Sequence, residues 1–350
     1  MSDSMTASRE VTGALGPRVR LTPYSAGNGL PVFVEPTDSV IAEDTQAACA
    51  WLREHQEVID AYLTDVGAIV LRGFAFPDTA AFNAAVEHYP DMPHGYVGGA
   101  TPRANISGRA FEATRAPGDA KLMFHQEMAY LPSYPRQLAF FCNRAPPSGG
   151  ATLIADVRKF DDAVPRRFRD EVHRRGVRYT RNFRDPEWST GDPAQDVYHR
   201  PWTEAFCTER SEEAEAACRA MGLDYRWEAN GSFSVIYVSP GFVTHPRTGR
   251  EIWFNQIMSQ TPNDRSIGSV RMEVYDRVYG RTLTRPYDTT FGDGEPFDPA
   301  DVQSLYPILD RLEVDFAWRN GDLMLLDNFY TFHGRSPFTG DRDVQVALIG

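Results

Sequence analysis

The stretch Phe124-His125-Gln126-Glu127-Met128 decides how the rest of this sequence is interpreted, because it places an imidazole and a carboxylate two residues apart in a segment that favours a strand. Residues i and i+2 of a strand share a face. The sequence therefore predicts that the side chains of His125 and Glu127 point the same way. With one more histidine supplied by the fold, they could hold a divalent metal in the 2-His-1-carboxylate arrangement that leaves positions open on non-heme Fe(II).

The second imidazole has to come from elsewhere in the chain, which contains eight histidines. The His-x-Glu spacing recurs at His55 and Glu57, but that copy lies in a helical pattern, where residues i and i+2 do not face each other. His333 differs because it follows the strand-like run 322–327 and precedes Gly334. A histidine just beyond a buried strand in the C-terminal part of the chain is where a jelly-roll metal site would take its last ligand. The other histidines lie beside prolines, in loops or at a basic helix end: His88, His94, His173, His199 and His245.

The composition is that of a folded acidic protein. Its 350 residues are 42% hydrophobic and 12% aromatic, which suffices for a large core. The net charge of -12 argues against a nucleic-acid partner, which needs a basic face. No stretch approaches the roughly 20 apolar residues of a membrane helix. Four scattered cysteines without metal spacing favour a cytoplasmic location.

Apolar periodicity and turn residues divide the chain into short elements. Helices are expected over 42–63, 78–88, 161–175, 212–221, 270–279 and 299–311, and strands over 68–74, 137–142, 151–156, 177–183, 322–327 and 344–349. Many short strands with fewer helices indicate a β-sandwich or barrel core with helical additions.

The domain organisation predicted from these elements is simple. Residues 1–20 are expected to form a flexible tail, and residues 21–350 a single domain. The polar and aromatic region near 184–222 is interpreted as an insertion or lid. The Gly-, Pro- and Arg-rich segment 95–120 leads into the His125 strand and is interpreted as an active-site loop.

A metal alone does not make an oxygenase, so the chain must also hold an organic cosubstrate. The segment from His333 through Gly340 suggests a hairpin that returns to the final strand and brings Arg342 back beside the metal. The planar guanidinium of arginine matches a carboxylate in bidentate fashion. Thr152 could add a hydroxyl bond to the same anion, and Arg335 is the alternative arginine for this role.

Three motifs follow one another along the chain: His125-Gln126-Glu127, Gly149-Gly150-Ala151-Thr152, and His333 followed by Arg342. In this order they resemble the Fe(II)/2-oxoglutarate-dependent dioxygenases of the TauD/TfdA-like family. Glu127 stands where much of that family has Asp. Shorter stretches are similar to its clavaminate-synthase-like and SyrP-like amino-acid hydroxylase branch, which also uses Glu: 67–74, Trp253-Phe254-Asn255-Gln256 and 290–294.

The resemblance implies a mainly β fold with helical additions: a double-stranded β-helix (jelly roll, cupin-like) flanked by helices, forming one catalytic dioxygenase domain. It implies Fe(II) on His125, Glu127 and His333, and O2 as a cosubstrate. It also implies 2-oxoglutarate held through its distal carboxylate by Arg342 and Thr152. Such enzymes convert 2-oxoglutarate to succinate and CO2 while they oxidise a substrate C–H bond. The retained carboxylate ligand argues against halogenation, for which related enzymes replace that residue.

The branch further implies hydroxylation of an amino acid or amino-acid-derived small molecule, free or presented by a carrier protein, in specialised-metabolite or antibiotic biosynthesis. Desaturation, epoxidation and cyclisation use the same cofactors and stay open, as does the oligomeric state. Four polar residues in stretches that face the expected pocket are candidates for substrate contacts: Asn105, Gln126, Arg181 and Asn255.

Other protein classes use some of the same residues. A zinc hydrolase also uses two histidines and a carboxylate with a bound water, but it has no need of Arg342 placed for a dicarboxylate. A non-catalytic jelly-roll binding protein has no reason to keep the whole ligand set. A JmjC-like demethylase shares the His-x-Glu pattern, and the absence of zinc-finger cysteines counts against it.

Overall fold

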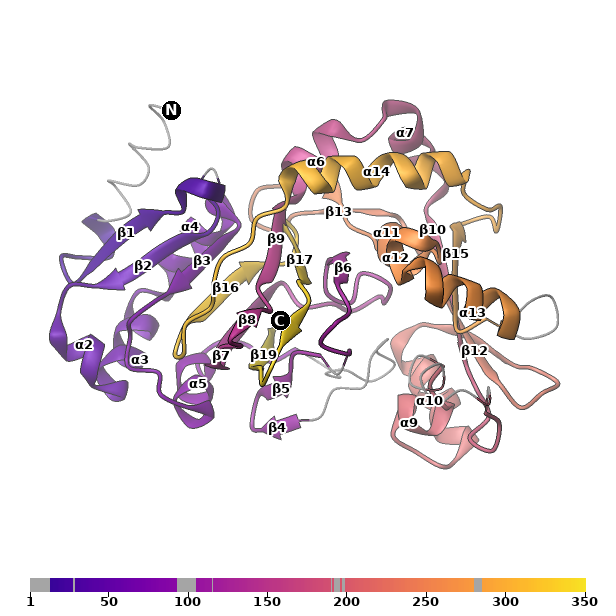
Figure 1. The fold of residues 1–350 in the computed structure, drawn as a ribbon, viewed down its shortest axis with the longest axis horizontal. Helices are drawn as coiled ribbons and strands as arrows, with labels where there is room; N and C mark the ends of the chain where they lie inside the picture. The colour runs from indigo at the N-terminus through magenta and orange to yellow at the C-terminus, as the bar shows by residue number, and fades with distance from the viewer. Residues whose placement is uncertain are drawn as a thin grey trace.

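One large sheet runs through the molecule in this computed structural model, which describes residues 13–27, 29–92, 105–114, 116–189, 191, 196, 199–279 and 285–350. Within that part of the chain the sheet has eight strands (Figure 1). Their order is β1 (Val19–Pro23), β2 (Val32–Pro36), β3 (Ala68–Leu71), β16 (Leu323–Asp327), β7 (Gln137–Arg144), β19 (Asp343–Ile349), β5 (Ala110–Glu112) and β4 (Asn105–Ser107).

A smaller sheet carries the residues that matter most for function. It has the order β6 (Leu122–His125), β17 (Thr331–Arg335) and β9 (Thr152–Asp156). Both pairings are antiparallel, and their register places His333 opposite His125 and Arg335 opposite Thr152. The short pair β8 (Ser148–Gly149) and β18 (Phe338–Thr339) extends the turn region beside it.

Strand alternation buries both faces of the large sheet. In β7, Leu138 and Phe140 belong to the core that also contains Phe332 of β17, whereas Ala139 and Phe141 belong to a second core. Successive side chains of a strand point to opposite faces, so the large sheet separates the two cores. The first core lies between the two sheets, as in a jelly roll.

The second core is covered by helices from the N-terminal part of the chain: α2 (Ser39–Glu43), α3 (Thr45–Glu54), α4 (Gln56–Val66) and α5 (Thr79–Val86) (Figure 1). The sequence predicted one helix over 42–63, and the structure divides it at Asp44 and at His55. The His55 Nδ1 donates to the Trp51 carbonyl at 2.8 Å, and its ring stacks on the Trp51 indole. The first His-x-Glu copy therefore lies at a helix junction.

The predicted tail ends earlier than residue 20. Leu15 and Val19 are almost fully buried in the second core, and β1 starts at Val19. Apolar side chains that gain burial order the backbone that carries them. Residues 1–12, the rest of the predicted tail, lie outside the described residues.

Further helices and a four-stranded sheet flank the first core. The sheet runs β11 (Asp224–Trp227), β12 (Phe233–Ser239), β10 (Val177–Phe183) and β15 (Tyr287–Phe291), and β13 (Phe242–Thr244) pairs with β14 (Glu251–Trp253). The helices are α6 (Val157–Ala163), α7 (Arg166–Arg175), α11 (Ile257–Gln260), α12 (Asp264–Ile267), α13 (Ser269–Tyr279) and α14 (Pro299–Leu312). The predicted helix 161–175 breaks before Pro165, because the residue that precedes a proline disfavours helical geometry.

The expected lid region near 184–222 contains α9 (Trp202–Phe206) and α10 (Ser211–Met221). Phe206 packs edge-on against Phe183 and Phe233 of the four-stranded sheet. The described part of this region therefore docks on that sheet, and none of its described residues lines the cavity described below. The described chain contains no helix long and apolar enough to cross a membrane.

Candidate metal centre and cosubstrate pocket

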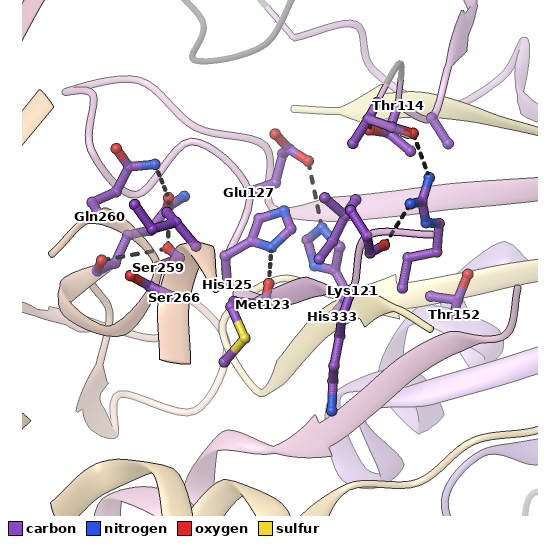
Figure 2. A pocket seen from close by; sticks show the side chains of 18 of the residues that line it. Thr114, Lys121, Met123, His125, Glu127, Thr152, Ser259, Gln260, Ser266 and His333 are labelled. Carbon is purple, nitrogen blue, oxygen red and sulfur yellow. Dashed lines mark hydrogen bonds and ion pairs between the residues drawn. The ribbon is translucent and has the colours of Figure 1, made fainter. Parts of the chain in front are cut away.

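Three potential metal ligands converge where β6 and β17 lie side by side. Donor atoms of His125, Glu127 and His333 lie within 4.8 Å of one another. The His333 Nε2 lies 3.4 Å from a carboxylate oxygen of Glu127, and the two imidazole centroids are 4.2 Å apart. Figure 2 shows the three side chains pointing toward one another. The fold thus joins segments that lie about 200 residues apart in the sequence.

Glu127 reaches this centre by a different route from the predicted one. The strand β6 ends at His125, and the chain turns immediately afterwards, with Met128 at a positive φ of 59°. Gln126 enters the core, where its amide donates to the carbonyls of Trp253 and Phe329, each at 3.0 Å. The prediction that His125 and Glu127 share one face of a strand is therefore wrong, although their side chains do converge.

The orientation of the imidazoles suits metal binding. The His125 Nδ1 donates to the Met123 carbonyl at 2.8 Å, which places the proton on Nδ1 and makes Nε2 the nitrogen that could bind a metal. The His333 ring is buried between His125 and Phe140, whose ring centroid lies at 5.5 Å. Packing therefore holds the second ring.

The spacing of the donors fits a single first-row metal ion. Metal–ligand bonds of roughly 2.1 Å place neighbouring ligands of an octahedral ion about 3 Å apart. The 3.4 Å between His333 and Glu127 is close to that value. Two neutral nitrogens and one carboxylate oxygen form the facial set that leaves three positions on Fe(II) for other donors.

A cavity of about 200 Å³ surrounds the three residues. Arg335, Arg342 and Thr152 line this cavity together with polar residues from other elements. In Figure 2 the ligand residues lie between Thr152 and Thr114 on one side and Ser259, Gln260 and Ser266 on the other. Polar side chains therefore lie on both sides of the three ligand candidates.

Arg342 lies in the cavity wall with part of its guanidinium available. Its Nε donates to the Gly150 carbonyl at 2.9 Å. Burial, with the nearby positive charge of Arg335, lowers the pKa of Arg342 to about 10. A guanidinium that is costly to ionise in this position becomes favourable once an anion pairs with it.

Arg335 is engaged differently. Its guanidinium donates to the backbone carbonyls of Ala116, Pro117 and Ala120. These bonds hold the described end of the predicted active-site loop against the cavity; residues 93–104 and 115 lie outside the described residues. Thr152 is buried, and its hydroxyl accepts a hydrogen bond from the Trp318 indole at 3.2 Å. The hydroxyl proton of Thr152 therefore remains available to an acceptor in the cavity.

The four candidate substrate residues fall in different places. The Gln126 amide already donates to two backbone carbonyls. Asn255 donates to the Gly241 carbonyl and accepts from the Ile257 amide, so it holds backbone as well. Asn105 is exposed on β4, where it donates to the Gly108 carbonyl. Only Arg181 approaches the cavity, with its guanidinium 4.6 Å from the ring centre of Tyr130, which lines it.

Several cavity residues were not predicted from the sequence: Lys121, Tyr130, Ser259, Gln260, Ser266 and Tyr287. Ser259 and Gln260 lie on α11, directly after the Trp253-Phe254-Asn255-Gln256 motif. This nearness to the motif is the one feature of the sequence that could have identified them as cavity residues. Tyr287 lies opposite Arg181 across β10 and β15. That pairing joins residues far apart in sequence, so no local pattern indicates it.

Comparison with known proteins decides the class. Residues 35–348 match the model of the taurine catabolism dioxygenase TauD, TfdA family. The chain belongs to the TauD/TfdA dioxygenase family. A clavaminate synthase-like protein of Arabidopsis thaliana is 30% identical over 303 residues, which cover 85% of this chain and 86% of that protein. The dapdiamide synthesis protein DdaC of Enterobacter agglomerans is 28% identical over 291 residues, which cover 83% of this chain and 84% of DdaC.

A solved structure supports the fold. PvcB, an Fe, alpha-ketoglutarate dependent oxygenase from an isonitrile synthetic pathway, matches with a TM-score of 0.50 at 15% identity over 95% of this chain and 92% of PvcB. The predictions of a jelly-roll fold and of this family are confirmed. As a TauD/TfdA family member, the protein is an oxidoreductase that uses Fe(II), 2-oxoglutarate and O2 on a small molecule. The zinc hydrolase and binding-protein alternatives are set aside on the same ground.

Proposed function

We propose that this TauD/TfdA family dioxygenase hydroxylates an unactivated C–H bond of an amino acid or an amino-acid-derived molecule in specialised-metabolite biosynthesis. The observation that carries the proposal is the convergence of His125, Glu127 and His333 within 4.8 Å, in a cavity that Arg342 and Thr152 also line. The similarity to the dapdiamide synthesis protein DdaC supports the amino-acid substrate and the biosynthetic context.

In the proposed site His125, Glu127 and His333 hold Fe(II), which supplies the oxygen-activating chemistry when bound. Arg342 pairs with the distal carboxylate of 2-oxoglutarate, because its two terminal nitrogens form the fork that matches a carboxylate. The Thr152 hydroxyl donates to the same anion. Burial of these groups strengthens each of these interactions, since little water competes for them.

The opposite side of the cavity is proposed to bind the substrate. Ser259 and Gln260 bring hydroxyl and amide groups to the cavity, where both also bond Gln256, and Tyr130 and Tyr287 bring phenol rings. Such a mixture suits a small molecule with polar ends and an aliphatic reacting carbon. Arg181, packed on Tyr130, is the proposed charged contact on this side.

Anaerobic reconstitution tests the proposed chemistry. The protein is loaded with Fe(II) and 2-oxoglutarate without oxygen, and a weak visible charge-transfer band is expected. Admission of oxygen with candidate amino acids should release succinate, and the mass of the product should increase by one oxygen atom. Loss of two hydrogens without oxygen gain would instead identify desaturation. Correctly folded protein that gives neither band nor succinate would contradict the proposal.

Two substitutions separate the metal from the cosubstrate. His333→Ala should abolish retention of Fe(II), because one of three ligands is lost. Arg342→Ala should retain Fe(II) and chiefly weaken 2-oxoglutarate binding.

The same amino acid offered free and as a carrier-protein thioester, in one competition assay, distinguishes the two forms of substrate by their relative rates of turnover.

A further inference from the structure

We infer that Asn328 is a positioning residue, which holds the Glu127 peptide in place and thereby sets the distance between Glu127 and His333. The Glu127 backbone amide donates to the Asn328 Oδ1 at 2.7 Å, and the Asn328 Nδ2 donates back to the Glu127 carbonyl at 3.1 Å. The same Nδ2 donates to the Pro135 carbonyl at 2.8 Å. One fully buried side chain thus satisfies both polar groups of the ligand residue's backbone.

The need for such a contact follows from the turn after His125. A residue within a strand has its N–H and C=O paired by the neighbouring strand, and buried backbone groups without partners are costly. Glu127 lies beyond the end of β6, so the sheet does not provide this pairing. The side chain of asparagine offers one carbonyl and one amide group, which reproduce the acceptor and donor of a strand neighbour.

Asn328 also lies on the segment that carries the other ligand. It precedes β17, the strand of His333, and its own amide donates to the Arg136 carbonyl at 3.0 Å. A displacement of this turn would therefore move both His333 and the support of Glu127. The two ligands that approach to 3.4 Å are linked through a single turn of the chain.

Neighbouring side chains fix the shape of that turn. The Asp327 Oδ1 accepts from the amides of Phe329 and Tyr330, at 2.9 and 3.0 Å. Its Oδ2 lies 3.0 Å from the His245 Nε2. The His245 Nδ1 accepts from two backbone amides, so the proton resides on Nε2 and points at Asp327. The imidazole, sequestered and stacked 4.3 Å from the Tyr330 ring, acts as a fixed donor.

The inference rests on the proposed metal site, and the test keeps the two apart. Asn328→Ala is compared with the parent and with Asn182→Ala, which removes a buried asparagine that bonds Arg285 and Ser234 away from the ligands. Dissociation constants for Mn(II) and anaerobic Fe(II) are measured by titration, beside thermal unfolding of the metal-free proteins. The charge-transfer band with 2-oxoglutarate is recorded for each.

Asn328→Ala is expected to weaken metal binding about 10- to 100-fold, the range found for partners that orient ligands, and to shift the band. Asn182→Ala is expected to lower the unfolding temperature with metal affinity within about twofold of the parent. Should Asn328→Ala fail to fold, the near-isosteric Asn328→Asp is used, which keeps the acceptor and loses the donor; weaker metal binding is again expected. The inference would be overturned if a folded Asn328 variant bound metal with the parent's affinity and showed the parent's charge-transfer band. It would also be overturned if Asn182→Ala lost as much metal affinity as the Asn328 variant. A parent that binds no metal would instead overturn the proposed function.

Discussion

At the scale of single residues, Arg342 combines a cost in stability with a proposed role in binding. Its pKa of about 10 lies below the usual 12.5. The unfolded chain therefore binds more protons between pH 10 and 12.5, and the penalty for the buried charge is fully present below pH 10. A shift of this size lowers the free energy of unfolding by at most about 3 kcal/mol. An uncharged residue in place of Arg342 would remove this penalty, but it would also lose the hydrogen bond to Gly150, which contributes about 1 kcal/mol.

Arg342→Met is therefore expected to unfold at a temperature equal to or a few degrees above that of the parent, while 2-oxoglutarate affinity falls roughly 100-fold because the charge-assisted pair is lost. Thermal unfolding with and without 2-oxoglutarate, in the presence of Fe(II) and absence of oxygen, measures both. The control is Arg144→Met, since Arg144 is exposed and its ion pair with Asp341 lies outside the cavity. A destabilised Arg342→Met protein, or one that binds 2-oxoglutarate as the parent does, would contradict this prediction.

Sequence patterns predicted the three metal-ligand candidates and the two cosubstrate candidates, all of which line one cavity. These candidates could be selected because few residue types bind Fe(II) and few histidines were available, and their roles stay predictions. The sequence patterns missed the turn that places Glu127, because the side-chain contacts of Gln126 are with residues 253 and 329, far away in the sequence. Local sequence does not distinguish polar side chains that hydrogen-bond backbone groups, such as Asn255 and Asn328, from side chains that contact a substrate.

At the scale of elements, most predicted strands and helices are present within a few residues of their expected bounds. The differences lie at breaks: His55 divides one predicted helix, and Pro165 divides another. A proline is visible in the sequence as a break signal, and its effect could have been predicted. The break at His55 depends on side-chain contacts with Trp51 that helical periodicity does not contain.

The segment that leads into α9 contains a buried histidine, which makes its docking sensitive to acid. Burial, together with the positive charge of Arg184, lowers the pKa of His199 from 6.5 to about 4. Its ring packs edge-on against Trp188 and Tyr279. As pH falls from 6.5 to 4 the unfolded chain takes up a proton that the folded chain resists. Up to about 3 kcal/mol of stability is therefore present above pH 6.5 and lost by pH 4.

His199→Phe is expected to flatten this dependence, because phenylalanine keeps an aromatic ring between the same neighbours and does not titrate. The unfolding temperature is measured from pH 7 to pH 4 for the parent, for His199→Phe and for His173→Gln. The His173 Nε2, on α7, lies 3.0 Å from a carboxylate oxygen of Glu251 with both side chains about half exposed. Water screens such an exposed pair, so replacement of His173 should change the slope much less than His199→Phe does. An identical slope in the parent and His199→Phe would show that other groups account for the acid sensitivity.

At the scale of the whole molecule, the large sheet separates a core that contains the cavity from a core that does not. The cavity residues Phe140 and Tyr130 belong to the first core, whereas the N-terminal helices pack on the second. A bound ligand stabilises a folded protein by RT ln(1 + [L]/Kd), about 2.7 kcal/mol at a concentration of 100 Kd. Local openings are suppressed only where they disrupt the ligand's contacts.

Metal and cosubstrate binding should therefore protect one side of this molecule selectively. With Mn(II) and 2-oxoglutarate added, amides of β6, β9, β17 and the turn at 126–131 that exchange through local opening should slow at least about tenfold. Those of β1, β2 and α2 should change by less than about twofold, because their buried side chains, apart from Phe33 of β2, belong to the second core. Hydrogen exchange read by mass spectrometry resolves these segments, and in His333→Ala the protection should vanish while exchange in β1 and β2 stays as in the parent. Equal protection of both sides would mean that Mn(II) and 2-oxoglutarate act on global unfolding alone. Protection confined to β1 and β2 would place the binding site of these ligands on the face of the large sheet opposite to the proposed metal centre.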